Sequence, residues 1–130
     1  MIYLDSSALL KLLFSEPESE ALSSWLSARA QQPKLTSQVS VVEVVRTCRR
    51  VDAEVEPAAW RLLAGLDLVP ISSTVVERAS HVGGTTLRSL DAIQLATALT
   101  VAEDLEATIA YDRRLLEAAE SERLPVTSPA

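Results

Sequence analysis

The fold is decided by residues 2–14, IYLDSSALLKLLF. The apolar run 2–4 has the length of a short buried strand, and it ends at Asp5, Ser6 and Ser7, which are residue types that cap helices. The leucine-rich run 8–14 then continues as a helix. This stretch predicts a strand that leads directly into a helix, as in an α/β fold.

The rest of the chain repeats this alternation. We expect strands over residues 34–37, 68–71, 108–111 and 124–126. We expect one helix that Pro17 opens at its first turn, one over 39–51 and one that starts at Pro57. Further helices are expected from the caps Ser72 and Ser73 to about Gly83, over 90–102 with Ser89 as its cap, and from Asp112 onward. Short apolar strands that alternate with helices predict an α/β fold, with a central parallel sheet of about five strands flanked by helices.

Residues 39–51, VSVVEVVRTCRRV, fit two descriptions. The five valines between residues 39 and 45 favour a strand, because β-branched side chains lose freedom in a helix. The run is too long for a typical strand, however, and its apolar positions do not alternate. Arg46, Arg49 and Arg50 recur at helical spacing, and we therefore predict a helix.

Length and composition set further limits. A chain of 130 residues, 48% of them hydrophobic, predicts one domain over residues 1–130. The single cysteine, Cys48, forms no disulfide within the chain, and no apolar stretch is long enough to span a membrane. We therefore expect a cytoplasmic protein. The net charge of −6 argues against a protein that coats nucleic acid by charge alone, but it is compatible with acids that surround a cation.

Four acids stand where a chemical site would form. Asp5 and Asp112 directly follow predicted strands, and sites in open α/β sheets form beyond the carboxyl ends of the strands. Asp91 lies near the start of an apolar helix, and Glu43 interrupts a run of valines. Singly, the three aspartates are explained as helix caps or first-turn acids, and Glu43 could pair with Arg46 on an exposed face. Gathered together, they would repel one another without a cation, and oxygen ligands suit Mg²⁺ or Mn²⁺.

The chain resembles the PIN-domain ribonucleases, in particular the VapC-type toxins of bacterial toxin–antitoxin pairs. The resemblance is densest in YLDSSALLKLLFSEPESE (3–20), TSQVSVVEVVRTCRR (36–50) and LRSLDAIQLATAL (87–99), and it is weaker in ATIAYDRRLLEAA (107–119). It implies an α/β fold with a sheet of about five parallel strands, metal-dependent cleavage of RNA, a homodimer and a VapB-type antitoxin as partner.

The resemblance also assigns the site. The family's acidic pocket falls on Asp5, Glu43, Asp91 and Asp112 as catalytic residues and ligands of Mg²⁺ or Mn²⁺, and its supporting hydroxyl falls on Ser7. Family members often have Ser or Thr two places before the last acid, where this chain has Ala110. A cation held there would activate water for attack on a phosphodiester.

Basic residues near the acids are candidate phosphate contacts. They are Arg46, Arg88 and Arg113, although solvated charges on helix faces are the ordinary explanation for each. Aromatic residues make up only 4% of the chain, so no stacking surface for RNA is evident.

Other functions fit less well. A pairing of Cys48 with His81, the only histidine, is formally available, but a buried thiol is the simpler interpretation. A phosphoacceptor receiver-like domain would need a lysine after its last strand, and the only lysines are Lys11 and Lys34. An aspartate-nucleophile phosphatase would carry Asp where Ser7 stands. The remaining alternative is a catalytically inactive PIN-like module that only binds a partner.

Overall fold

Five parallel strands form a single sheet in the computed structural model, which describes residues 1–130. The strand order is β3-β2-β1-β4-β5. The strands are β1 (Ile2–Leu4), β2 (Lys34–Ser37), β3 (Asp67–Val69), β4 (Ala107–Ile109) and β5 (Val126–Thr127). The α/β fold with a five-stranded parallel sheet is thus confirmed.

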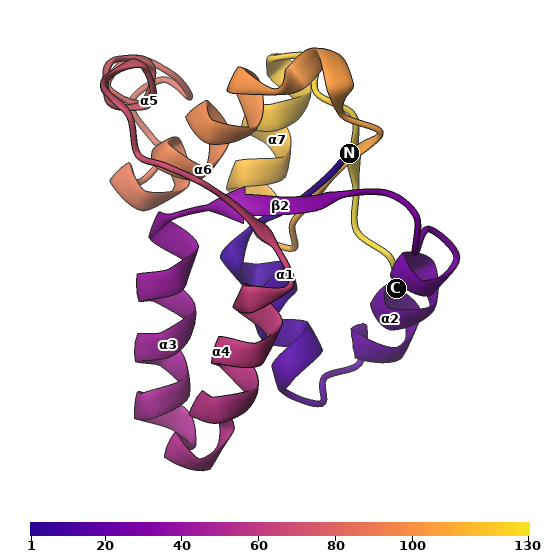
Figure 1. Cartoon of the computed structure of the whole chain (residues 1–130). Coiled ribbons are helices and arrows are strands. Elements are labelled where there is room, and N and C mark those ends of the chain that lie inside the picture. The colour runs from indigo at the N-terminus through magenta and orange to yellow at the C-terminus, as the bar shows by residue number, and fades with distance from the viewer.

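Helices cover both faces of the sheet, which makes three layers (Figure 1). They are α1 (Ser6–Leu13), α2 (Ser19–Ser27), α3 (Val39–Val51), α4 (Glu56–Ala64), α5 (Ser73–Ala79), α6 (Ser89–Thr100) and α7 (Arg113–Ser121), with 3₁₀ turns at Ala53–Val55 and Ala102–Asp104. In Figure 1, α1, α3 and α4 lie below β2, and α5, α6 and α7 lie above it.

The central strand β1 divides the core into two. Successive side chains of a strand point to opposite faces, so Ile2 and Leu4 pack with α1 to α4, whereas Tyr3 packs with α6 and α7. All three side chains are at most 1% exposed. A strand buried on both faces explains why β1 is an uninterrupted apolar run.

Most element predictions hold, and the errors lie at their ends. Strand β1 and helix α3 have the predicted bounds, and Ser72 and Asp112 cap their helices as expected. Ser89 was wrong as a cap, because it is already helical and Arg88 takes the cap position without a side-chain hydrogen bond. The same helix ends at Thr100 rather than at residue 102, where a 3₁₀ turn begins.

The valine-rich segment is a helix that buries one side, although Val42 and Val51 are exposed. Val44, Val45 and Cys48 are buried against α1 and α4, while Arg46 and Arg50 are exposed. The thiol of Cys48 is free and buried, as expected. His81 is exposed and bonds the carbonyl of Glu77, so the two residues do not form a site. No helix is long and apolar enough to cross a membrane.

Candidate active site at the carboxyl edge of the sheet

Two of the predicted acids come after strands that are neighbours in the sheet. Leu4 of β1 pairs with Ile109 of β4, so the two strands end at the same level. Asp5 follows directly, and its backbone N–H donates to the carbonyl of Ile109 at 3.1 Å. Asp112 follows β4 three residues later, at the start of α7.

Asp5 is the most deeply buried of the four acids, at 2% exposed. Its Oδ1 accepts hydrogen bonds from the Ser7 hydroxyl at 2.6 Å and from the Ala8 N–H at 3.0 Å, which caps α1. Burial still dominates and, with the nearby charges of Glu43 and Asp91, raises the pKa of Asp5 to about 7. A helix cap alone does not require such burial, so capping does not account for this aspartate.

Ser7 joins the two strand ends that carry the aspartates. Its hydroxyl donates to Asp5 and accepts from the backbone N–H of Tyr111 at 3.0 Å. Ala110 beside it is buried and offers no hydroxyl, and its carbonyl accepts from the Ser128 hydroxyl at 2.6 Å. The hydrogen bond that a Ser or Thr could make from position 110 is therefore missing from this chain.

Glu43 and Asp91 approach the same edge from α3 and α6. Burial raises the pKa of Glu43, against a lowering by hydrogen bonds from Gln94 and Ser6, and the charge of Asp91 raises it further. Burial and the charge of Asp112 raise the pKa of Asp91, while the positive charge of Arg88 lowers it. Glu43 makes no ion pair with Arg46, and its Oε1 accepts from the side-chain amide of Gln94 at 2.9 Å.

The four carboxylates form one electrostatic group. Asp5 interacts with Glu43 and Asp91, Glu43 with Asp91, and Asp91 with Asp112. None of the five ion pairs of the protein involves any of them. No three of its His, Cys, Asp or Glu side chains are arranged so that they could hold a metal ion as they stand. The acids are thus neighbours with unneutralised charge rather than a closed cage.

Gln94 supports the site, although it was not among the predicted site residues. It is 1% exposed on α6, one turn after Asp91. Its side-chain amide donates to Ser40 at 2.8 Å as well as to Glu43, and its carbonyl oxygen accepts from the hydroxyl of Tyr3. A glutamine inside the apolar run AIQLA (92–96) was the available signal, because a buried amide needs polar partners.

Replacing Gln94 with Leu is expected to cost both stability and alignment of the site. Tyr3 and Ser40 would lose a buried partner, which corresponds to about 1–3 kcal/mol of unfolding free energy. Urea denaturation measures this loss, with Thr100→Ala on the exposed end of α6 as the control. An unchanged midpoint for Gln94→Leu would show that the network does not stabilise the fold.

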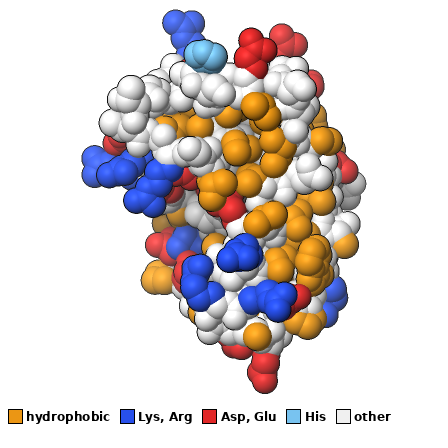
Figure 2. Space-filling view, turned by 90° about the vertical axis from the view of Figure 1, so that its left-hand side faces the viewer, with side chains coloured by type: hydrophobic (Ala, Val, Ile, Leu, Met, Phe, Trp, Pro, Cys, Tyr) orange, Lys and Arg blue, Asp and Glu red, His pale blue; other side chains and the backbone are white.

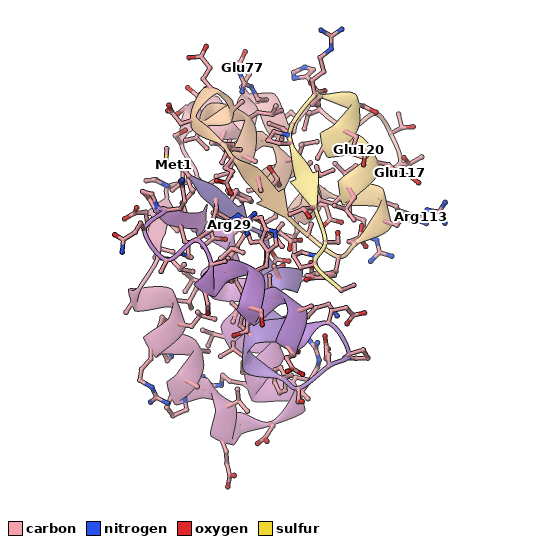
Figure 3. The ribbon with its side chains drawn as sticks, turned by 90° about the vertical axis from the view of Figure 1, so that its right-hand side faces the viewer. Met1, Arg29, Glu77, Arg113, Glu117 and Glu120 are labelled. Atoms are coloured by element: carbon pink, nitrogen blue, oxygen red, sulfur yellow. The ribbon has the colours of Figure 1, made fainter.

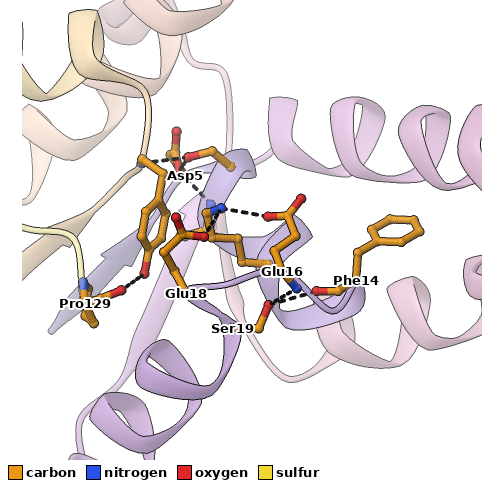
Figure 4. Close-up of polar contacts among 10 residues, drawn as sticks. Asp5, Phe14, Glu16, Glu18, Ser19 and Pro129 are labelled. Atoms are coloured by element: carbon orange, nitrogen blue, oxygen red, sulfur yellow. Dashed lines mark hydrogen bonds and ion pairs between the residues drawn. The ribbon is translucent and has the colours of Figure 1, made fainter.

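Two basic residues near the acids already have partners. Lys11 on α1 binds Glu16 at 2.7 Å and Glu18 at 2.8 Å, and its ammonium lies over the ring of Tyr111 (Figure 4). Arg113 pairs with Glu117 one turn along α7, at the outer surface of the molecule (Figure 3). Arg46 and Arg88 are exposed and make no ion pair.

Comparison with known proteins identifies the family of this fold and site. The sequence model of the PIN domain matches residues 2–121. The ribonucleases VapC35 and VapC47 of Mycobacterium tuberculosis are 44% and 42% identical to the chain, and each alignment covers 99% of this chain and 97% of the relative. The chain belongs to the VapC-type ribonucleases of the PIN-domain family.

The fold of this VapC-type protein also matches solved structures. A toxin–antitoxin complex from Klebsiella pneumoniae contains a chain that superimposes with a TM-score of 0.72 at 21% identity, covering 100% of this chain and 98% of the other. The family is generally metal-dependent. The resemblance, the fold and the ribonuclease class predicted from the sequence are therefore confirmed.

Proposed function

We propose that this VapC-type protein is a metal-dependent endoribonuclease whose catalytic residues and metal ligands are Asp5, Glu43, Asp91 and Asp112. The observation that carries the proposal is Asp5, a buried carboxylate with no cationic partner that stands beside two further acids. Burying a charge in this way is unfavourable unless something neutralises it. A divalent cation is the partner that the four acids together fit.

The donor set decides which cation fits. Carboxylate oxygens are the ligands that Mg²⁺ and Mn²⁺ prefer, and no histidine or cysteine belongs to the group. Mutual repulsion accounts for carboxylates that do not close into a cage by themselves. When bound, such a cation supplies Lewis-acid stabilisation of the phosphate and lowers the pKa of a water molecule.

The chain's own residues hold the acids in position for this chemistry. Ser7 orients the Asp5 carboxylate through its 2.6 Å hydrogen bond, and Gln94 orients Glu43. Asp112 has one oxygen engaged in capping α7, through the N–H of Leu115 at 3.0 Å. Its position beside Asp91 suits a ligand that completes the group directly or through water.

As a VapC-type ribonuclease, the chain is the toxin of a VapBC toxin–antitoxin pair, with RNA as its substrate and a VapB-type antitoxin as its partner. Support comes from the VapC relatives and from the fold neighbour solved within a toxin–antitoxin complex. A homodimer and action in the cytoplasm are further parts of the proposal. Sedimentation of the antitoxin-free protein tests the dimer.

Cleavage of RNA with and without metal tests the proposed function. The antitoxin-free chain, incubated with total cellular RNA and Mg²⁺ or Mn²⁺, is expected to produce discrete fragments, and EDTA should prevent them. An Asp91→Asn variant purified in the same way should be inactive, which excludes a contaminating nuclease.

Expression in a bacterial host gives a second test. Induction of the chain should arrest growth, whereas Asp91→Asn should not. A folded, metal-binding protein that neither cuts RNA nor arrests growth would favour the inactive partner-binding module instead.

A further inference from the structure

Two arginines on α3 lie along the side of the helix that carries Glu43. Arg46 and Arg50 follow Glu43 by three and seven residues. At 3.6 residues per turn, Arg50 lies about 20° and Arg46 about 60° around the helix from Glu43, and they stand roughly 4.5 and 10 Å further along its axis. Both arginines therefore continue the surface that begins at the acidic edge.

Arg46 and Arg50 have no acidic partner within the chain, unlike their neighbour Arg49. Both are exposed, and neither makes an ion pair. Arg49 between them turns to another side and pairs with Glu56 at 3.5 Å. The charge of a helix C-terminus favours basic residues in its last turn, which accounts for Arg50 but not for Arg46 in the middle of the helix.

Helix α3 lies on the side of the molecule toward which the strands run. The strands in Figure 1 run toward its left side, and Figure 2 looks at that side. It shows several Lys and Arg side chains in the lower half of this face, where α3 and α4 lie, and a further group at its left edge, with acidic side chains near its middle and beside the lower group. On a protein with a net charge of −6, this is a local basic surface beside the acidic edge.

We propose that Arg46 and Arg50 bind successive phosphates of the RNA strand on one side of the scissile bond and so position it across the acids. The inference rests on the proposed ribonuclease function and adds the path of the substrate. Guanidinium groups suit phosphate oxygens, and such contacts hold a strand without reading its bases. Binding through them is expected to depend on salt but not on RNA sequence.

The test measures RNA binding without cleavage. Fluorescence anisotropy follows a labelled single-stranded RNA added to the Asp5→Asn protein, with and without the further changes Arg46→Gln and Arg50→Gln. We expect the double change to weaken binding roughly tenfold at low salt, and to flatten the plot of log affinity against log salt by about 0.7 per arginine. Two RNAs of unrelated sequence should be affected equally.

The matched control is Arg78→Gln. Arg78 is also exposed and without an ion pair, but it lies on α5 beside His81 in a separate cavity. In the otherwise unmodified enzyme, the α3 changes should raise KM and leave kcat nearly unchanged, and melting temperatures should confirm that each variant is folded.

The outcomes separate this inference from the proposed function. If the unmodified protein cuts RNA but the α3 variants bind with the same affinity and salt dependence as the control, the path along α3 is wrong and the nuclease stands. If the unmodified protein neither cuts nor binds RNA, both proposals fail.

Discussion

Replacing Asp5 with Asn should reduce RNA cleavage by ~10²-fold or more, the largest functional effect expected of any single change in this chain. Asn keeps the size of Asp and can still cap α1 through its side-chain oxygen. It removes the charge that a divalent cation requires, and with it the electrostatic stabilisation of the phosphate. Initial cleavage rates of a labelled RNA with saturating Mn²⁺ measure the loss.

Asp52→Asn is the matched control for this prediction. Asp52 also caps a helical turn, through the N–H of Glu54 at 3.1 Å, but it is exposed and lies outside the acidic group. The Asp52→Asn variant should cleave RNA at the same rate as the unmodified protein. Equal activity of Asp5→Asn and Asp52→Asn would leave Asp5 with a capping role only.

The second large effect concerns stability, which should fall as pH rises when no metal is present. The pKa of Asp5 is raised by burial from 3.8 to about 7. A carboxyl group whose pKa is raised in the folded state stabilises that state fully at pH values below its unfolded pKa. This stabilisation is lost as pH rises through the folded pKa of about 7. Between pH 4 and 8 the loss is on the order of 4 kcal/mol, or roughly 15 °C in melting temperature.

Thermal unfolding in EDTA at pH 4 and pH 8 measures this loss. Asp5→Asn should be more stable than the unmodified protein at pH 8, because the amide carries no charge to bury. Part of the pH dependence should remain in the variant, since the pKa values of Glu43 and Asp91 are raised in the same direction.

Added Mn²⁺ should restore the melting temperature of the unmodified protein at pH 8 but not that of Asp5→Asn, because only a cation-bound native state gains stability. A melting temperature of the unmodified protein that is the same at both pH values would contradict the assigned cause, the buried charge of Asp5.

Local sequence was sufficient for much of the fold because its signals act over a few residues. The apolar run 2–4, the caps Asp5, Ser72 and Asp112, and the helical repeat in 39–51 all describe contacts within one or two turns. The ends of α6 were missed for the opposite reason. Arg88 and Val101 take the two cap positions of that helix, and neither is a residue type that marks a helix end in the sequence.

The candidate site, too, could be predicted only in part from local sequence. Residue types and positions indicated Asp5, Glu43, Asp91 and Asp112, because acids at strand ends and inside apolar runs are unusual. The resemblance to the PIN-domain family assigned all four to one pocket. Their actual neighbourhood depends on the strand order, which places β1 next to β4 although about 100 residues separate them. No spacing within the sequence contains that information.

By itself, the sequence determined the alternation of strands and helices, and it indicated which acidic residues could lie at the carboxyl edge of the sheet. Both follow from local pattern and side-chain chemistry. Only the tertiary structure decided which of these groups are buried together. It brought Gln94 from α6 against Glu43 of α3, and it left Arg46 without an ion pair. Burial and pairing are properties of contacts between distant segments, and those contacts exist only once the sheet has formed.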